Sequence, residues 1–348
     1  MPAGELILLA PPEIPPPAAR QWLQVLMVLP MVAMMGATML MFSGTSSGSI
    51  RFVVFGMMGV GMLGMVVMGM LQGSGPSKRE MGHARRTYLR QLAQHRLRLR
   101  RSVRRQRTVL EYLHPDPAAL WSLAASYRLW ERRRDDPDFG VARIGRGAQS
   151  PATTLVAPDT KPLEELEPLS ALALRRFITT YATIDRLPIA IAVNGFSRIY
   201  LRGDRDAALG MLRALIAQLA TLHSPDDLRV AICAADERRH DWEWVKWLPH
   251  AAHPDRADAL GPLRLVAPAI AALESMLEEE LATRPRFDPD VDTRWFGPHL
   301  VVVLDGGSVA GSGHLMTGRG VEGVTVVDLT TPPPRALDRG AVVLDVAA

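Results

Sequence analysis

Residues 199–223 have the layout of a phosphate-binding loop. The pattern predicts a strand at Ile199–Leu201, a turn at Arg202–Asp206 and a helix at Asp206–His223. A loop of this kind uses glycine to let the backbone approach phosphate, lysine to supply charge, and serine or threonine to hold magnesium. The order of elements therefore predicts a nucleotide-binding architecture, and the residues at those positions decide whether the chemistry is present.

Those residues do not fit a working site. Counted from Gly203 as the first glycine, Ala208 stands in place of the second glycine, Leu209 in place of the lysine and Gly210 in place of the hydroxyl. Two acidic side chains in the turn would repel a triphosphate, Asp204 and Asp206. We therefore expect no working Walker A motif and no catalytic residue in this segment.

The residues after a later apolar run also argue against a working nucleotide site. The apolar run Leu300–Leu304 predicts a buried strand, and Asp305 follows it where a magnesium-linked acid would stand. Gly306 then occupies the usual place of a catalytic glutamate. Asp305 is thus the one candidate for a weak nucleotide contact, and we expect no tightly bound cofactor.

Other candidate chemistry is weaker. His250, His253 and Asp255 could suggest metal ligands, but no further His or Cys nearby supports a tetrahedral set, so no metal site is expected. The single cysteine, Cys233, lies in an apolar run, which excludes a disulfide within the chain and predicts an inert core residue. A Gly-x-Ser-x-Gly pattern at Gly44–Gly48 lies between two apolar runs and does not join a strand to a helix, as a nucleophile elbow must.

The surrounding sequence predicts a parallel sheet covered on both faces, because apolar runs alternate with helical patterns. Besides the strands already given, the predicted elements are the strands Leu187–Val193, Leu228–Ala234 and Val324–Leu329 and the helix Ala267–Leu281. Ligands of such sheets bind beyond the carboxyl ends of the strands. We assign residues 148–348 to an α/β, RecA-like domain with a degenerate P-loop, entered through a Pro- and Thr-rich connection at 149–167.

Two long uncharged runs precede this domain. Leu23–Phe42 and Phe52–Leu71 each have 20 residues, which as helices would span about 30 Å, the thickness of a bilayer's hydrocarbon core. The short polar segment Ser43–Arg51 joins them, so residues 23–71 are predicted to be a transmembrane hairpin. Because basic residues follow the second run and only Arg51 lies between the runs, both termini are predicted to be cytoplasmic, with residues 1–22 as a leader.

Residues 77–147 are predicted to form a basic helical stalk. Between Lys78 and Arg107 lie 12 of the 40 Lys and Arg residues and one acid, Glu80. Apolar residues recur on one helical face of this segment, namely Tyr88, Leu92, Leu99, Val103 and Leu110. The arginine-rich remainder could face anionic headgroups, an acidic partner or nucleic acid. Nucleic acid is the least supported of the three, because no groove-reading motif follows.

A further helix is predicted after this segment. Asp116 is placed as its N-cap with Pro117 at the first helical position, and the pattern continues through Arg134. The run FGVARIGRG that follows predicts a strand leading into a glycine turn.

Several of these stretches carry a resemblance to a known family. The run AALGMLRALIAQLATLHSPDDLRVAICAADERRHDWEWVKWLPHAAHP and the later GPHLVVVLDGG resemble the first, degenerate domain of EccC, the membrane-anchored FtsK/SpoIIIE-type ATPase of type VII (ESX) secretion systems. The most specific part is the run with Trp242, Trp244 and Trp247, followed by Leu-Pro-His and His-Pro. The hairpin, the basic stalk, LWERRRDDPDFGVARIGRG and LRRFITTYATIDRLPIAIAV follow in the family's order, so the resemblance covers nearly the whole chain.

The resemblance implies a role in protein export from the plasma membrane. Family members couple ATP and magnesium chemistry in further ATPase domains, on the same or a separate chain, to export of small helical-hairpin proteins. They assemble with EccB, EccD and EccE, with six units around one pore. This sequence departs from that pattern at its end, because it stops at Ala348 before such domains.

Two other functions compete with this one. A membrane-anchored FtsK-type DNA translocase has a similar layout, but it would bind duplex DNA through motor domains not present in this sequence and would usually have more membrane spans. A standalone nucleotide hydrolase is opposed by Leu209 and Gly306. We therefore expect a secretion-motor component that acts by assembly, without nucleic acid.

Overall fold

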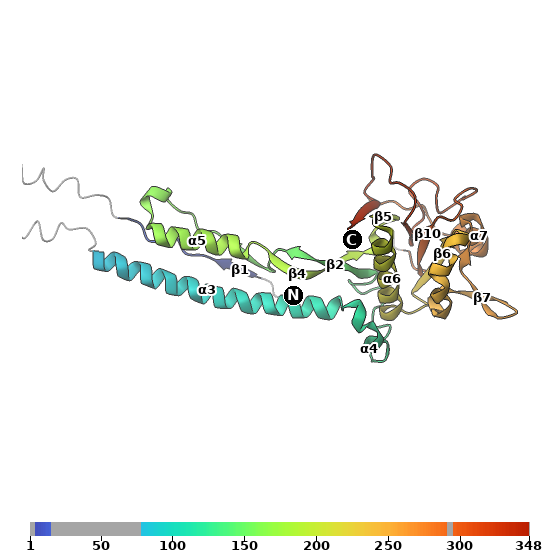
Figure 1. Cartoon of the computed structure of the whole chain (residues 1–348), viewed down its shortest axis with the longest axis horizontal. Coiled ribbons are helices and arrows are strands. Elements are labelled where there is room, and N and C mark those ends of the chain that lie inside the picture. The colour runs from blue at the N-terminus through green and yellow to red at the C-terminus, as the bar shows by residue number, and fades with distance from the viewer. Residues whose placement is uncertain (1–3, 15–77, 291–294, 348) are drawn as a thin grey trace, which may run out of the picture. The chain divides into compact units, whose positions relative to one another are not determined.

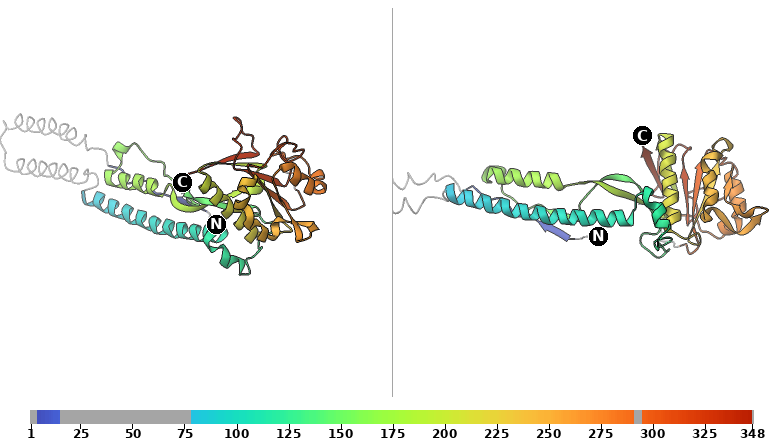
Figure 2. Two further views of the ribbon diagram at one scale, coloured as in Figure 1. Left: turned by 45° about the vertical axis from the view of Figure 1, so that its right-hand side comes forward. Right: turned by 60° about the horizontal axis from the view of Figure 1, so that its bottom comes forward.

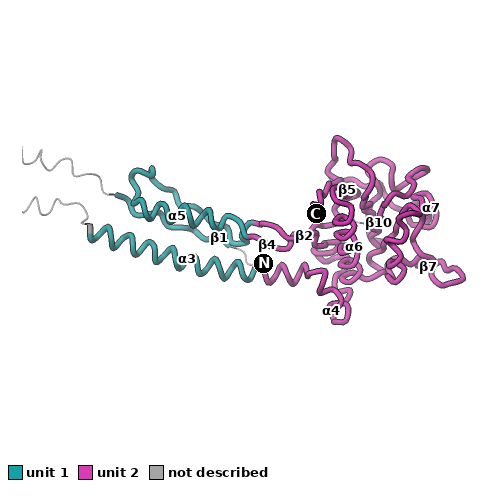
Figure 3. The backbone as a smooth tube through the Cα atoms, in the orientation of Figure 1, with its two compact units in different colours: residues 1–106, 150–184 teal, residues 107–149, 185–348 magenta. Residues whose placement is uncertain are grey.

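The computed structural model describes residues 4–14, 78–290 and 295–347. The chain divides into two compact units, one of residues 1–106 and 150–184 and the other of residues 107–149 and 185–348 (Figure 3). No helix of the described residues is long and apolar enough to cross a membrane. The two predicted spans and the Gly44–Gly48 pattern fall within residues 15–77, outside the described residues.

Unit 1 is built on the basic helix. Helix α3 covers Lys78–Leu113, and helix α5, Pro168–Tyr181, lies beside it (Figure 1). The two helices run in the same direction, because Arg85 of α3 pairs with Glu167 at the start of α5 and Arg100 donates to the Tyr181 hydroxyl at its end. Residues 78–113 of the predicted stalk thus form one continuous helix.

The apolar stripe of α3 forms the core of this unit. Its core contains Leu8, Tyr88, Leu92, Leu99, Leu174 and Phe177. The N-terminal strand β1, Gly4–Ile7, pairs in parallel with β3, Thr153–Val156, although their residues lie far apart in the sequence. Residues 150–184, assigned from the sequence to the α/β domain, therefore pack in unit 1, and the predicted connection at 149–167 contains a strand.

Unit 2 contains a six-stranded sheet in the order β12-β5-β11-β10-β6-β9, with every pair parallel. Its strands are β5 (Arg198–Gly203), β6 (Leu228–Ala234), β9 (Val266–Ala267), β10 (His299–Asp305), β11 (Val324–Asp328) and β12 (Ala341–Val346). The predicted parallel sheet is confirmed, although β9 and β12 at its edges were not predicted. Numbered in chain order without the short β9, the strands lie in the order 5-1-4-3-2, which is consistent with a RecA-like ATPase domain.

Helices cover both faces of this sheet (Figure 2). Helix α6, Arg205–Leu222, packs on one face against Val301 and Val303 of β10. Helices α7, Ile270–Met276, and α8, Glu278–Ala282, occupy the other face against alternate residues of the same strand. Buried apolar area of this kind stabilises the fold by about 25 cal/mol per Å² without any ligand.

Some predicted elements take a different form. The predicted helix after Asp116 is a short 3-10 turn, Pro117–Ala119, and α4, Leu120–Ala124. The chain does not return to a helix after Ala124: at Trp130 it adopts a positive φ of 56°, and the Trp130 backbone N–H donates to the carbonyl oxygen of Thr221 in α6. The strand predicted at 187–193 is β4, Ile184–Ala192, which pairs with β2, Val141–Gln149, outside the large sheet.

The remaining elements connect these parts. They are the 3-10 helices Leu163–Glu165, Val193–Gly195, Asp236–Trp247 (η4) and Pro249–Ala251, and the antiparallel hairpin of β7 (Ala252–Asp258) and β8 (Gly261–Arg264). Arg132, 2% exposed, holds the start of β2 in place. Its guanidinium donates to the carbonyl oxygens of Leu113, Asp138 and Val141 and pairs with the Asp138 carboxylate. Arg132, in the run LWERRRDDPDFGVARIGRG, therefore has a structural role.

Candidate functional site

The turn where a phosphate-binding loop would lie is too short to wrap a phosphate. Strand β5 ends at Gly203, Asp204 caps the next helix by accepting a hydrogen bond from the Ala207 N–H at 2.8 Å, and α6 begins at Arg205. A phosphate-binding loop instead leaves several residues between strand and helix, so that successive N–H groups can point at the ligand. Here the N-cap carboxylate takes up one of those groups.

Gly203 serves chain packing at this turn. Its φ is +110°, and a Cβ added there would lie 2.0 Å from the carbonyl oxygen of Val346 in β12. The Asp204 N–H donates to the same oxygen at 3.2 Å. The glycine that suggested a phosphate loop therefore makes room for the neighbouring strand.

The three substituted positions lie within helix α6. Ala208 and Leu209 are buried and pack in the core on this face of the sheet, and Gly210 is exposed. A leucine fixed in the core cannot be exchanged for a lysine that reaches a phosphate without losing apolar burial. The structure thus places Ala208, Leu209 and Gly210 where the sequence predicted, in the first turns of the helix.

Asp305 lies at the end of β10 with no exposed surface, and the protein's own side chains saturate its carboxylate. Arg205 donates to both oxygens, Nη1 to Oδ1 at 2.9 Å and Nη2 to Oδ2 at 3.1 Å. Arg238 Nη1 donates to Oδ1 at 2.8 Å, and Trp242 Nε1 donates to Oδ2 at 3.0 Å. Each oxygen therefore accepts two hydrogen bonds, and we name these four residues the Asp305 clamp.

The clamp keeps this buried carboxylate ionised. Burial by itself raises the pKa of Asp305, but the hydrogen bonds from Arg205, Trp242 and Arg238 outweigh burial and hold the pKa below its usual range. The pKa of the Arg205 guanidinium is raised, chiefly by its hydrogen bond to Asp305. Both partners are thus stabilised in their charged forms.

A network of charges extends from the clamp. Arg205 Nη2 also donates to Asp241 at 3.2 Å, and Arg213 donates to the same carboxylate at 3.0 Å. Two carboxylates, Asp305 and Asp241, are therefore shared by three guanidinium groups, those of Arg205, Arg213 and Arg238. The network joins the start of α6 to η4 and to the end of β10.

Gly306 leaves little space for the side chain of a catalytic glutamate. Its φ is +77°, and an added Cβ would lie 3.1 Å from Nη1 of Arg238. A side chain here would strain the backbone and displace a guanidinium of the clamp. The guanidinium of Arg238 thus lies close to the space that a glutamate side chain at position 306 would need.

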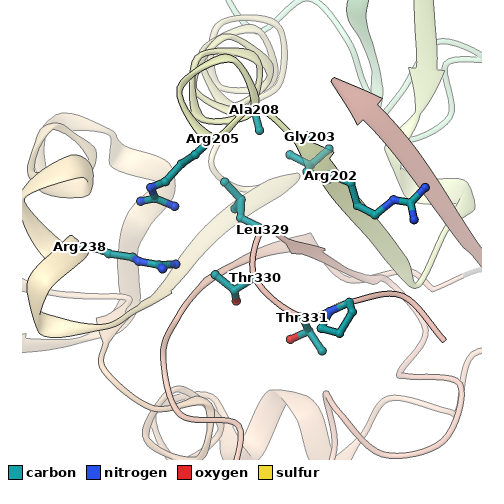
Figure 4. A pocket seen from close by; sticks show the side chains of 10 residues that line it. Arg202, Gly203, Arg205, Ala208, Arg238, Leu329, Thr330 and Thr331 are labelled. Carbon is teal, nitrogen blue, oxygen red and sulfur yellow. The ribbon is translucent and has the colours of Figure 1, made fainter. Parts of the chain in front are cut away.

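A pocket of about 380 Å³ opens beside the clamp, over the carboxyl ends of the strands (Figure 4). Arg205 and Arg238 reach toward one another across it, while Arg202 points away and pairs with Asp345. Thr330 and Thr331 line the opposite side, where their N–H groups donate to the Asp328 carboxylate. The pocket therefore presents guanidinium edges and hydroxyl groups, with no nucleophile and base in contact.

The other sequence candidates have structural partners. His250 is buried against the carbonyl oxygen of His223, and the ring of His253 contacts the carbonyl of Met276 and the N–H groups of residues 255 and 256. Cys233 lies in the core of β6, where burial raises the pKa of its thiol to about 11. Across the described ranges no three His, Cys, Asp or Glu side chains lie together as a metal site would require.

The tryptophan run divides between core and surface. Trp242 is 2% exposed and belongs to the clamp, whereas Trp247 is 80% exposed. The sequence favours a packed helix face or an interface over a ligand site for this run, and the part that packs in the core is Trp242. Sequence reasoning also missed Arg205, Arg238 and Asp241. The one signal for Arg238 and Asp241 was the charged run DERRHDW directly after β6, at the edge of the sheet where ligands bind.

The fold of unit 2 is consistent with the class of RecA-like ATPase domains. A parallel α/β sheet with the strand order of RecA-like ATPases holds, at its ligand edge, an internal arginine clamp. No protein-family model matches the chain.

Curated relatives name the family more closely. The chain is 44% identical over 330 residues to the ESX secretion system protein EccC of Thermomonospora curvata, which covers 95% of this chain and 25% of that protein. It is 37% identical over 340 residues to EccC3 of the Mycobacterium tuberculosis ESX-3 system, with the same shares, and 33% identical over 260 residues to EccCa1 of its ESX-1 system, which covers 72% of this chain and 33% of that protein. The chain is thus homologous to EccC proteins of ESX secretion systems along nearly its whole length, and it spans about a quarter of the length of the first two relatives.

Proposed function

We propose that this chain is the membrane-anchor, stalk and non-catalytic ATPase-like portion of a type VII secretion motor. Three features support the proposal: the homology to EccC proteins, the two uncharged runs at 23–42 and 52–71, and the Asp305 clamp. The clamp is the observation that carries it, because the group that would meet magnesium is already bound on both oxygens. The domain then acts through its surfaces and its rigidity.

The clamp supplies that rigidity. In a working nucleotide site, phosphate and magnesium tie the strand end to the start of the following helix. Here Arg205 joins α6 to Asp305 of β10, and Arg238 and Trp242 join η4 to the same carboxylate. The sheet edge is therefore held without a ligand, which suits a domain that passes movement or assembly state between the stalk and further ATPase domains.

The wider assembly follows from the relatives. ATP and magnesium would act in those other domains, and the exported cargo would be small helical-hairpin proteins. EccB, EccD and EccE type components and six copies of the unit would form the complex in the plasma membrane, with both termini of this chain cytoplasmic. The exposed arginines of α3 would face headgroups or acidic partner surfaces.

A tagged copy of the chain, expressed in an actinobacterium that has an ESX system, tests this proposal. We expect it in the membrane fraction after a carbonate wash and in one detergent-stable complex with the other ESX membrane components. Recovery in the soluble fraction, or recovery with duplex DNA in place of those components, would contradict the proposal. The DNA result would favour a translocase.

A further inference from the structure

One end of unit 1 exposes a group of large apolar side chains. Leu163 is 57% exposed, Leu169 56%, Leu172 62% and Ile14 41%. Leu169 and Leu172 lie three residues apart in the first turns of α5, so they project from neighbouring positions of one face. Solvent-exposed leucines gathered at one end of a unit mark an interaction surface.

Three segments meet at this end. The Ile14 N–H donates to the Glu165 carbonyl oxygen at 2.6 Å, and Arg85 of α3 lies 3.6 Å from the Glu167 carboxylate. Lys78, where α3 begins, is seven residues before Arg85, or about 10 Å along the helix axis. The loop at 163–167 thus contacts Ile14, the last described residue before the two apolar runs. It also contacts α3, the helix that follows those runs.

This position identifies the occupant. The chain passes from Ile14 into the uncharged runs 23–42 and 52–71 and returns at Lys78, with only residues 72–77 between the second run and α3. If those runs span a bilayer, as the proposed function holds, the end of unit 1 with the exposed leucines faces the headgroups. Helix α5 runs parallel to α3, so its first turns, and not its last, lie on that side.

The charges around the leucines suit a shallow contact. Lys161 pairs with Glu13 at 2.7 Å and lies 3.9 Å from Glu165. Arg176 is exposed on α5, on the helix face that also carries Leu169 and Leu172. Acidic and basic groups nearly balance here, so apolar burial drives the contact and anionic lipid is not required. Carboxylates at the rim keep the surface in the headgroup region.

We propose that Leu163, Leu169, Leu172 and Ile14 form a membrane-seating patch that inserts into the interfacial region of the cytoplasmic leaflet. The patch would fix the stalk against the bilayer, so that α3 leaves the membrane in a defined direction. This inference rests on the proposed membrane anchor and adds a second, interfacial contact to it.

Site-specific labelling tests the patch. The full-length chain, carrying Leu169→Cys or Leu172→Cys, is labelled with an environment-sensitive fluorophore and reconstituted in phosphatidylcholine vesicles. Cys233 needs no replacement, because it is buried and its thiol pKa is raised to about 11 by burial. The matched control is Leu260→Cys, in the β7–β8 hairpin of unit 2, where the side chain is 98% exposed.

We expect lipids that carry a spin label near the headgroup to quench the fluorophores at 169 and 172 at least 2-fold, and to leave the one at 260 unchanged. The same result is expected when a third of the lipid is phosphatidylglycerol. Chains that float with the vesicles but show equal, weak quenching at all three positions would overturn the patch alone. Chains that do not float with the vesicles would overturn the membrane anchor, and the patch with it.

Discussion

Replacing Asp305 by asparagine removes one charge from the buried end of β10 while keeping the size of the side chain. The carboxylate accepts four hydrogen bonds, two on each oxygen, from Arg205, Arg238 and Trp242. An asparagine has one amide oxygen and one NH₂ group. In either orientation of the amide, the NH₂ group takes the place of one carboxylate oxygen and faces the two N–H donors that bound that oxygen. Two of the four bonds are lost; Arg238 loses the counter-charge of Asp305, and Arg205 keeps Asp241 as its remaining acidic partner.

The magnitude follows from those two bonds. A hydrogen bond to a charged group contributes about 1.5–3 kcal/mol, and an unsatisfied buried donor costs a comparable amount. Arg205 and Arg238 are 39% and 36% exposed, so water compensates part of the loss. We expect Asp305→Asn to lower the free energy of unfolding by about 2–4 kcal/mol. The control Asp345→Asn, whose 71% exposed carboxylate pairs with Arg202, should cost about 0.5 kcal/mol or less.

Urea unfolding of the two purified variants and the original chain, followed by circular dichroism, measures these differences. A working nucleotide site would respond differently, because an unneutralised acid in an empty site strains the fold and its removal commonly stabilises it. Equal or higher stability of Asp305→Asn would therefore refute the clamp.

Three further predictions follow from other contacts. Gly306→Glu should restore no ATP hydrolysis and should lower the melting temperature, because it strains a φ of +77° and displaces Arg238; a magnesium-dependent rate in this variant would contradict the account. Burial lowers the pKa of His223 to about 4 and that of His299 to about 3, so their stabilising contribution is complete above the unfolded pKa near 6.5 and is lost as the pH falls below it, by about 2 kcal/mol each at pH 5. Urea unfolding at pH 7 and pH 5 checks this, and His299→Gln should reduce the difference. Reversing the charges of Arg98, Arg101 and Arg105 to Glu should leave the helix content and membrane attachment intact but break co-purification with ESX components; retention of all partners would make α3 a solvated spacer.

Much of the sheet could be predicted from the sequence, because periodicity reports burial directly. The runs at 228–234 and 300–304 proved to be central strands, and the apolar face of 206–223 packs on the sheet as predicted. The position of Asp305 followed from the same logic, since a strand's carboxyl end lies at the ligand edge. The long basic helix was predictable because its apolar stripe keeps one period over several turns.

What could not be predicted rests on contacts between distant segments. The pairing of β1 with β3 joins residues 4–7 to residues 153–156, and no local pattern specifies such a partner. The helical pattern after Asp116 continues to Arg134, but α4 ends at Ala124 and the Trp130 N–H bonds to α6. The same holds for the site: no local pattern identifies Arg205, Arg238 and Trp242 as partners of Asp305, and only the fold brings their donors onto one carboxylate.

At the ligand edge of this sheet, the protein's own side chains occupy the place of a nucleotide. Isothermal titration of the purified full chain with magnesium-ATP, repeated with Asp305→Ala, tests it most directly. We expect no binding by the original chain at millimolar nucleotide and no binding by the variant. Binding by the original chain with a submillimolar dissociation constant, lost in Asp305→Ala, would contradict it.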